Sequence, residues 1–170
     1  MDGTTMKKIP TLYMRDENNR QHVTHQINEK AEWVFETDAI PTRKYDGTCV
    51  FMDDCLQWWA RREVKPDKNP PPEYWSISTD PNTGKTVGWE PIQESSFYRW
   101  FQIAETVSFF ERRADPGTYE LVGPKINGNH EMLRQHLLIK HGSHTSPYER
   151  EELQQLHAVL HDLHPKMWFP

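Results

Sequence analysis

The stretch KYDGTCVFMDDCLQWWARREV, residues 44–64, carries the clearest fold signal in the chain. Residues 48–52 (TCVFM) follow Gly47 and are rich in the β-branched and aromatic side chains that favour strands. The acidic pair at 53–54 is typical of a turn, and residues 56–64 return as a second run of strand-forming residues. Two such runs joined by a short turn predict an antiparallel β-hairpin.

Outward from this hairpin, the sequence alternates short strands, loops marked by proline or glycine, and helices. Apolar spacing predicts helices over 93–113 and 147–163. Further strands are expected at 33–36 and 119–122, a short strand or extended arm at 7–14, and loops at 65–73 and 80–91. Within the hairpin, Trp58 and Trp59 point to opposite faces of their strand, so one of them is expected in the core. These patterns predict an α+β fold of antiparallel sheets with flanking helices, formed as a single domain over residues 1–170.

The composition limits the class of protein. The chain has 170 residues, with 20 Lys and Arg against 25 Asp and Glu and a net charge of −5. The mean hydropathy is −0.89, and no apolar run approaches the roughly 18 residues that a membrane span needs. A net acidic chain does not coat nucleic acid by charge alone, although a local basic groove stays open. With no secretory signal and only two cysteines, we expect a cytoplasmic monomer that does not bind membranes.

Lys44, at the start of the hairpin, is the best candidate for a nucleophile. A lysine attacks only in its neutral form, which burial or nearby cations favour. Candidates for such positive neighbours are Arg43, Arg61, Arg62 and Lys65, or a divalent metal ion. Gly47 lets the backbone bend tightly and approach a ligand. The pattern Lys-x-Asp-Gly is a weak signal by itself, because a surface turn with a solvated lysine gives the same letters.

Three motifs, in order along the chain, are similar to those of a known enzyme family. Residues 42–50 (TRKYDGTCV) resemble the nucleophile motif of the covalent nucleotidyltransferases, which include ATP-dependent ligases and mRNA capping enzymes. Residues 59–66 (WARREVKP) resemble the basic strand that follows in one RNA ligase family. Residues 117–129 (GTYELVGPKINGN) resemble its third motif, an aromatic-Glu-Leu-x-Gly segment with an Asn-Gly-Asn tail. Over roughly residues 7–145, the chain thus resembles the small RNA ligase 1 family.

This resemblance implies an ATP-grasp-like nucleotidyltransferase (adenylation) domain that joins the 5′-phosphate and 3′-hydroxyl ends of RNA. Lys44 is implied as the catalytic residue that attacks the α-phosphorus of ATP and forms a lysyl–AMP intermediate. The implied cofactors are ATP and Mg²⁺ (or Mn²⁺), with Glu120 as metal ligand and ribose contact and Tyr119 near the adenine. The implied nucleotide-binding residues are Thr42, Arg43, Asp46, Gly47, Arg61, Lys65, Tyr119 and Glu120.

Two further motifs of that family have no counterpart, since neither a Glu-Gly pair nor a Lys-x-Lys pattern occurs in the chain. Three interpretations stay open. The chain is a ligase fragment truncated at its C-terminus, a ligase completed by a second polypeptide, or a relative that binds nucleotide or RNA without catalysis. A capping-type guanylyltransferase with the same Lys44 chemistry is a further alternative, because these residues do not determine the choice of base.

Candidate metal sites outside these motifs are weaker. His157 and His161 are four residues apart in the expected second helix, a spacing that can bind zinc. The same spacing also arises where the leucine face of a helix meets solvent, and this is the favoured interpretation. Cys49 and Cys55 have no second cysteine pair, so a cysteine-based zinc site is not expected, and Cys49 is expected to pack within its strand.

Overall fold

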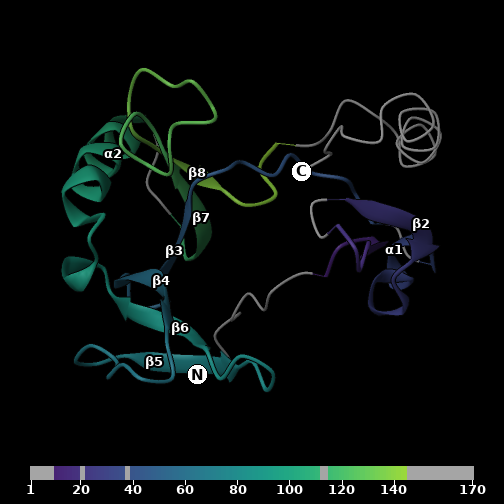
Figure 1. The fold of residues 1–170 in the computed structure, drawn as a ribbon. Coiled ribbons are helices and arrows are strands. Elements are labelled where there is room, and N and C mark those ends of the chain that lie inside the picture. Colours follow the sequence, from purple (N-terminus) through teal and green to yellow (C-terminus); the bar gives the residue numbers. More distant parts are fainter. Residues whose placement is uncertain (1–9, 20–21, 37–38, 112–114, 145–170) are drawn as a thin grey trace. The chain divides into compact units, whose positions relative to one another are not determined.

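The computed structural model describes residues 10–19, 22–36, 39–111 and 115–144. The chain divides into two compact units. The larger unit comprises residues 1–7 and 45–143, and the smaller unit comprises residues 8–44 and 144–170. Figure 1 shows the elements of both units. The expected helix 147–163, with His157 and His161, lies outside the described residues.

The larger unit is built on a six-stranded sheet in which every neighbouring pair is antiparallel. Its strands are β3 (Thr48–Met52), β4 (Trp58–Val64), β5 (Trp75–Thr79), β6 (Thr86–Pro91), β7 (Gly117–Val122) and β8 (Leu137–Lys140). Their spatial order is β5-β6-β4-β3-β7-β8. The hairpin predicted from residues 44–64 is therefore the centre of the sheet, and the predicted strand at 119–122 is confirmed as its neighbour β7.

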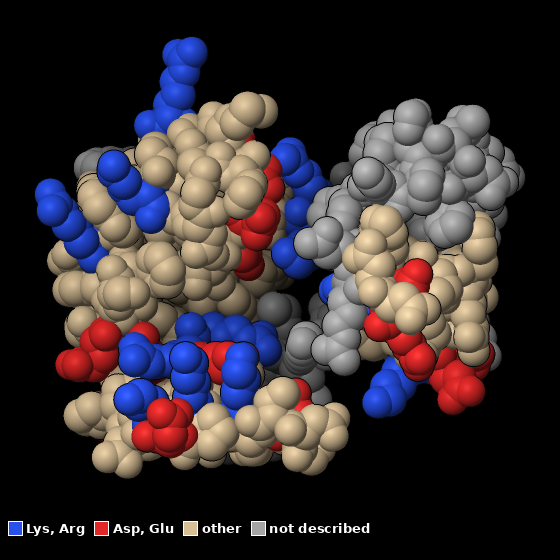
Figure 2. All heavy atoms as spheres, viewed as in Figure 1, with Lys and Arg blue, Asp and Glu red and all other residues tan. Residues whose placement is uncertain are grey.

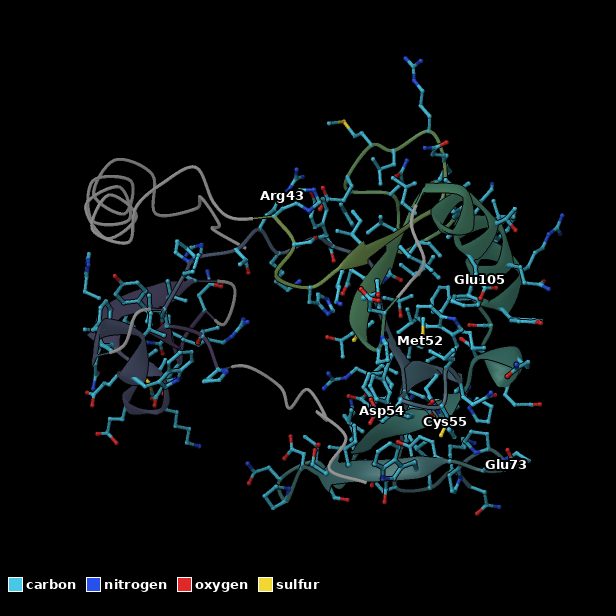
Figure 3. The ribbon with its side chains drawn as sticks, turned by 180° about the vertical axis from the view of Figure 1, so that it is seen from behind. Arg43, Met52, Asp54, Cys55, Glu73 and Glu105 are labelled. Carbon is cyan, nitrogen blue, oxygen red and sulfur yellow. The ribbon has the colours of Figure 1, made fainter. Side chains whose placement is uncertain are left out.

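The turn between β3 and β4 is organised by one carboxylate. Asp53 Oδ1 accepts hydrogen bonds from the backbone N–H groups of Cys55 and Gln57, at 2.9 and 2.8 Å. Its Oδ2 accepts a further bond from the indole N–H of Trp59 at 3.0 Å. Met52, Asp54 and Cys55 are labelled in Figure 3, where β3 ends and this turn begins. Because these bonds reach to residue 57, β4 begins at 58 and not at 56.

Helix α2 (Tyr98–Glu111) packs on one face of the sheet and completes the main core (Figure 1). The predicted helix 93–113 is confirmed in its middle, and its residues 112 and 113 lie outside the described part. It begins at 98 because residues 92–94 form a 3₁₀ turn, η2, after which Ser95 is extended (φ −73°, ψ 139°). The buried residues of this core are Val50, Ala60, Ile92, Phe101, Ala104, Tyr119, Leu121 and Ile126.

The two adjacent tryptophans of β4 lie on opposite faces of the sheet. Trp58 lies on the α2 side, edge-on to Phe101 and Tyr119, with ring centroids 5.1 and 5.3 Å apart. Trp59 lies on the opposite side, where it packs against a second cluster that contains Phe51. The expected alternation is confirmed, and both tryptophans contribute to packing.

One predicted loop contains a strand. Residues 80–84 form the expected turn, with Gly84 N–H donating to Asp80 O at 2.8 Å, but residues 86–91 form β6, which pairs with both β4 and β5. In the sheet, Gly88 is needed for space, because a Cβ there would lie 2.4 Å from the carbonyl oxygen of Trp75. The proline-rich segment 65–73 is confirmed as a loop without helix or strand.

The smaller unit holds a two-stranded antiparallel sheet, β1 (Tyr13–Arg15) and β2 (Val23–Ile27), followed by a 3₁₀ turn, η1 (Glu29–Ala31), and a short helix, α1 (Trp33–Glu36). The strand predicted at 33–36 is therefore wrong. Asn28 caps η1 by accepting the N–H of Lys30 at 3.1 Å, and Glu32 continues in helical geometry. The capped turn thus leads the chain into a helix despite the strand-forming residues that follow.

The described elements confirm the α+β class, with antiparallel sheets and few helices. In the parts of the chain that the structure describes, no helix has the length and apolar character needed to cross a membrane.

The packing of α2 predicts a sharp contrast between two positions of that helix. Phe101 is 2% exposed, and Ile103 is 43% exposed. We expect Phe101→Ala to lower the free energy of unfolding by about 3–5 kcal/mol, because it leaves a cavity between α2 and the sheet. Ile103→Ala should change it by less than about 1 kcal/mol. Denaturant titration measures both, and similar losses at the two positions would contradict this placement of α2.

His136 predicts a pH dependence of stability. The side chain stacks on Trp100 with ring centroids 5.0 Å apart, and its Nε2 accepts the N–H of Lys125 at 3.3 Å. Burial, and then the charge of Lys125, lowers the pKa of His136 below 6.5. The unfolded chain therefore binds this proton more tightly, and stability falls as the pH drops below 6.5 until the lowered pKa is passed. His136→Asn should remove up to about 1.4 kcal/mol per pH unit from that slope.

The control for this titration is His130→Asn, since the His130 side chain is 67% exposed. Unfolding free energies measured between pH 7.5 and 5 should keep the wild-type slope in this variant. Equal slopes in the wild type and in His136→Asn would rule out His136 as a source of acid sensitivity.

Candidate nucleotide and metal site

The sheet face opposite α2 carries a row of polar side chains. Cys49 on β3 is directly opposite Glu120 on β7, and Glu120 is directly opposite Ile139 on β8. Because alternate residues of a strand share a face, Cys49 and Glu120 lie on the side away from the Tyr119 core. His141 follows β8 and bonds to Glu120, which extends the row.

Glu120 is the centre of this row. Its Oε1 accepts the backbone N–H of Gly47 at 3.0 Å, and its Oε2 lies 2.9 Å from Nε2 of His141. The Glu120 side chain is only 12% exposed. A buried carboxylate of this kind needs such donors, and it keeps lone pairs that can accept hydroxyl groups or bind a cation.

The loop that enters β3 is held to the segment between β7 and β8. Asp46 donates its N–H to Glu131 Oε1 at 2.9 Å, and the Asn127 side-chain amide donates to the carbonyl oxygen of Gly47 at 2.6 Å. Asn127 adopts a positive φ of 41° within this segment. The Lys-x-Asp-Gly and Asn-Gly-Asn motifs are thus joined by a hydrogen bond from the Asn127 side chain to the backbone of Gly47, 80 residues away in the sequence.

Gly47 is required at this point for space. A Cβ at Gly47 would lie 2.2 Å from the carbonyl oxygen of Leu121 and 2.7 Å from a side-chain carbon of Val122. The backbone of the motif therefore lies directly against β7, which brings its N–H within reach of Glu120. The sequence interpretation of this glycine as a point of close approach is consistent with this geometry.

The electrostatics of the row are clearest at Cys49. Burial, and then the negative charge of Glu120, raises the pKa of the Cys49 thiol to about 12, and the neighbouring Arg61 offsets only part of this rise. Arg61 also donates a hydrogen bond to the sulfur. The thiol is therefore protonated at neutral pH, and the guanidinium of Arg61 lies at the same site as Glu120. Cys49 does pack within its strand, as expected.

Basic residues also lie on and beside β4, and Arg61 among them is next to Cys49 of the row. Figure 2 shows Lys and Arg side chains gathered over the part of the larger unit where β4 and β6 run, with acidic side chains among them. Some are paired, since Arg62 contacts Glu90 at 3.0 Å and Lys85 contacts Glu63 at 2.7 Å. This surface is therefore a mixture of charges with basic residues prominent, in a chain of net charge −5.

The structure brings together only part of the predicted site. Asp46, Gly47, Arg61 and Glu120 meet in the larger unit. Tyr119 does not join them, because its ring is buried on the α2 side and its hydroxyl donates to the Asp115 carbonyl at 2.6 Å.

The remaining predicted residues lie elsewhere along the chain. Lys65 is exposed just after β4. Thr42, Arg43 and Lys44 belong to the smaller unit, where Arg43 donates its N–H to the His144 carbonyl at 2.9 Å. Arg43 is labelled in Figure 3. Lys44 is exposed and is the residue directly before the larger unit begins.

Two members of the site, Glu131 and His141, are not among the residues predicted for it. Glu131 lies in irregular structure, and no local pattern marks its contact with Asp46. His141 could have been found, because the apolar run LLIK at 137–140 is a strand signal and the residue two positions after Ile139 shares its face.

Two chemical functions are available to this arrangement. The Glu120 carboxylate can accept ribose hydroxyls or provide an oxygen ligand to Mg²⁺, which is usually held by one or two carboxylates together with substrate phosphates. Cys49, Glu120 and His141 also offer one ligand atom each, all within 4.8 Å of one another. The Glu120 carboxylate, at the centre of the row, takes part in both of these functions.

Comparison with known proteins links the chain to RNA ligases. Proteins named RNA ligase 1 from Pongo abelii, Rattus norvegicus and Mus musculus are 27%, 24% and 23% identical to it. Each match covers 83% of this chain and 67% of the relative. No protein-family model matches the sequence. The relationship to the RNA ligase 1 family is distant and extends over most of the chain.

The close approach at Gly47 predicts a steric effect of substitution. Gly47→Ala should lower the free energy of unfolding by about 1–3 kcal/mol, because the added methyl group overlaps the Leu121 carbonyl. Gly142→Ala is the comparison, since a Cβ there meets no atom within 4 Å and only its positive φ of 78° opposes alanine. Thermal or denaturant unfolding measures both variants. A Gly47→Ala protein as stable as the wild type would contradict the contact with β7.

Proposed function

We propose, from its distant relationship to the RNA ligase 1 family, that this chain is an ATP-dependent RNA ligase that acts through a lysyl–AMP intermediate at Lys44. Its substrates are ATP and the 5′-phosphate and 3′-hydroxyl ends of RNA. Its cofactor is Mg²⁺, for which Glu120 is the oxygen ligand in this chain.

The observation that carries this proposal is the hydrogen bond between Gly47 and Glu120. It joins the loop of the first motif to the strand of the third across 73 residues of sequence. The second motif supplies Arg61 on β4, beside Cys49. Three segments that resemble nucleotidyltransferase motifs thus lie next to one another on one sheet, which supports a shared nucleotide site. The chain from Lys44 to Gly47 is three residues long, so their Cα atoms lie within about 11 Å.

Each residue of the group has a role that follows from its chemistry. Glu120 accepts the ribose hydroxyls, and His141 orients its carboxylate from the side opposite Gly47. Arg61 provides positive charge toward phosphate oxygens, since a guanidinium matches phosphate geometry. Bound Mg²⁺ supplies electrostatic stabilisation of the charge on the phosphoryl oxygens. The protein itself contributes mainly positioning and fixed charge.

The proposed reaction has three displacements at phosphorus. Neutral Lys44 Nζ attacks the α-phosphorus of ATP; an N–P bond forms, the bond to pyrophosphate breaks, and Nζ loses a proton to solvent. An oxygen of the RNA 5′-phosphate then attacks the same phosphorus, the N–P bond breaks, and the amine recovers a proton. Finally the 3′-hydroxyl attacks the RNA 5′-phosphorus, AMP leaves, and the hydroxyl proton goes to solvent.

The first step gives a direct test of the nucleophile. The purified chain, incubated with ATP and Mg²⁺, should gain the mass of one AMP in intact-mass spectrometry, and Lys44→Ala should gain none. Lys68→Ala, which removes an exposed lysine of the loop after β4, should behave as the wild type. An adduct in Lys44→Ala, or none in the wild type under these conditions, would contradict the proposal.

The later steps separate the ligase from the related activities. A 5′-phosphorylated RNA should collect AMP from the adduct and then become joined to a 3′-hydroxyl end, visible as a longer product on a denaturing gel. An adduct formed from GTP and not from ATP would instead identify a capping-type guanylyltransferase. RNA binding in a mobility-shift assay without AMP transfer would identify a binding protein of the same family.

A further inference from the structure

The residues Cys49, Glu120 and His141 form a group that the proposed ligase reaction does not fully use. They offer a sulfur, a carboxylate oxygen and an imidazole nitrogen, and these three atoms lie within 4.8 Å of one another. The three come from neighbouring parts of one sheet: β3, β7 and the residue directly after β8. Strand pairing therefore holds their backbones in place before any ligand binds.

We propose that Cys49, Glu120 and His141 form a binding site for one thiophilic divalent cation, Zn²⁺, distinct in chemistry from the Mg²⁺ of the ligase reaction. Zinc is bound by cysteine sulfur, histidine nitrogen and carboxylate oxygen, whereas Mg²⁺ takes oxygen ligands only. Three protein ligands leave a fourth position for water or another ligand, as in zinc sites that are open to solvent.

The distances between the donors suit such an ion. Zinc binds sulfur at about 2.3 Å and nitrogen or oxygen at about 2.0–2.2 Å, so tetrahedral ligand atoms lie roughly 3.3–3.7 Å apart. In this structure His141 Nε2 and Glu120 Oε2 are 2.9 Å apart, and all three atoms fall within 4.8 Å. Small movements of the side chains therefore reach tetrahedral geometry. The His141 ring can make them, because its Nδ1 has no hydrogen-bond partner among the described residues.

The charges also balance. A Cys49 thiolate and the Glu120 carboxylate together offset the +2 charge of the ion, and Arg61 donates a hydrogen bond to the sulfur as an outer partner. On binding, the S–H bond of Cys49 breaks, an S–Zn bond forms and its proton goes to solvent. The ring proton shared between His141 and Glu120 moves to Nδ1, and Nε2 becomes the metal ligand.

Metal binding at this site has a consequence for the nucleotide, and this part rests on the proposed function. Glu120 is both a zinc ligand and the proposed ribose contact. A zinc ion held by its carboxylate therefore competes with a bound nucleoside, and zinc should inhibit adenylation of the chain.

The metal site is tested without any nucleotide. Co²⁺, a coloured substitute for Zn²⁺, should bind the metal-free chain with a 1:1 ratio and give an absorption band from sulfur-to-cobalt charge transfer. Zn²⁺ should displace it, and a large excess of Mg²⁺ should not. Cys49→Ser should abolish the band, and His141→Asn should weaken Co²⁺ binding at least about tenfold. Circular dichroism checks that each variant is folded. If Cys49→Ser does not fold, the loss of Co²⁺ affinity in His141→Asn is the deciding measurement.

Matched controls separate this site from the other cysteine and histidines. Cys55→Ser changes an exposed cysteine in the β3–β4 turn, and His130→Asn changes an exposed histidine; both should bind Co²⁺ as the wild type does. Binding without a charge-transfer band, binding unaffected by Cys49→Ser and His141→Asn, or displacement by Mg²⁺ would each overturn the proposal.

Adenosine tests the shared use of Glu120, since it presents ribose hydroxyls without the phosphates that would bind the metal. Adenosine should weaken Co²⁺ binding in proportion to its concentration. Unchanged Co²⁺ binding would overturn the competition at Glu120 and leave the metal site in place. Loss of the AMP adduct in the ligase test has no bearing on the cobalt measurement, so the two failures are distinguishable.

Discussion

The backbone of the β3 entry loop lies against β7 with no room for a side chain, and the rest of the site depends on this contact. Gly47 is the residue that makes it possible, since a Cβ there would overlap the Leu121 carbonyl. The approach turns the Gly47 N–H toward the Glu120 carboxylate, while Asn127 holds the Gly47 carbonyl. A mostly buried carboxylate thereby obtains the donor it needs, and a loop rich in polar residues becomes ordered at the edge of the core.

The two faces of the sheet have different tasks. Toward α2, the strands present apolar side chains such as Val50 and Leu121, which are fully buried. Away from α2, the same strands present Cys49 and Glu120 beside an aromatic cluster around Trp89. Because successive side chains of a strand point to opposite faces, neighbouring residues in the sequence lie on different faces of the sheet. Tyr119 serves the core and Glu120 the site, although both belong to the same motif.

Glu120 is also the point at which two kinds of chemistry meet. Its carboxylate is a hard oxygen ligand suited to hydroxyl groups and Mg²⁺, and it lies beside a sulfur and an imidazole that favour zinc. With the thiol protonated, as its raised pKa implies, the row acts as an oxygen and nitrogen site. With the thiol deprotonated by a metal ion, it becomes a mixed sulfur site. The ligase proposal and the zinc proposal thus use the same Glu120 carboxylate, in the first case beside a protonated Cys49 thiol and in the second beside a metal-bound thiolate.

The sequence alone determined the central hairpin, the middle of the helix predicted at 93–113, the strand at 119–122 and the three motifs that resemble those of RNA ligases, because each depends on residues close together in the chain. The local pattern also gives one wrong prediction. Trp33–Glu36 is predicted as a strand, but it forms a helix that follows a capped 3₁₀ turn. Only the tertiary structure decided that Gly88 belongs to a strand, that Tyr119 faces the core, and that Glu131 and His141 join Asp46 and Glu120. These contacts span tens of residues, and they follow from strand order and register, which local spacing does not specify.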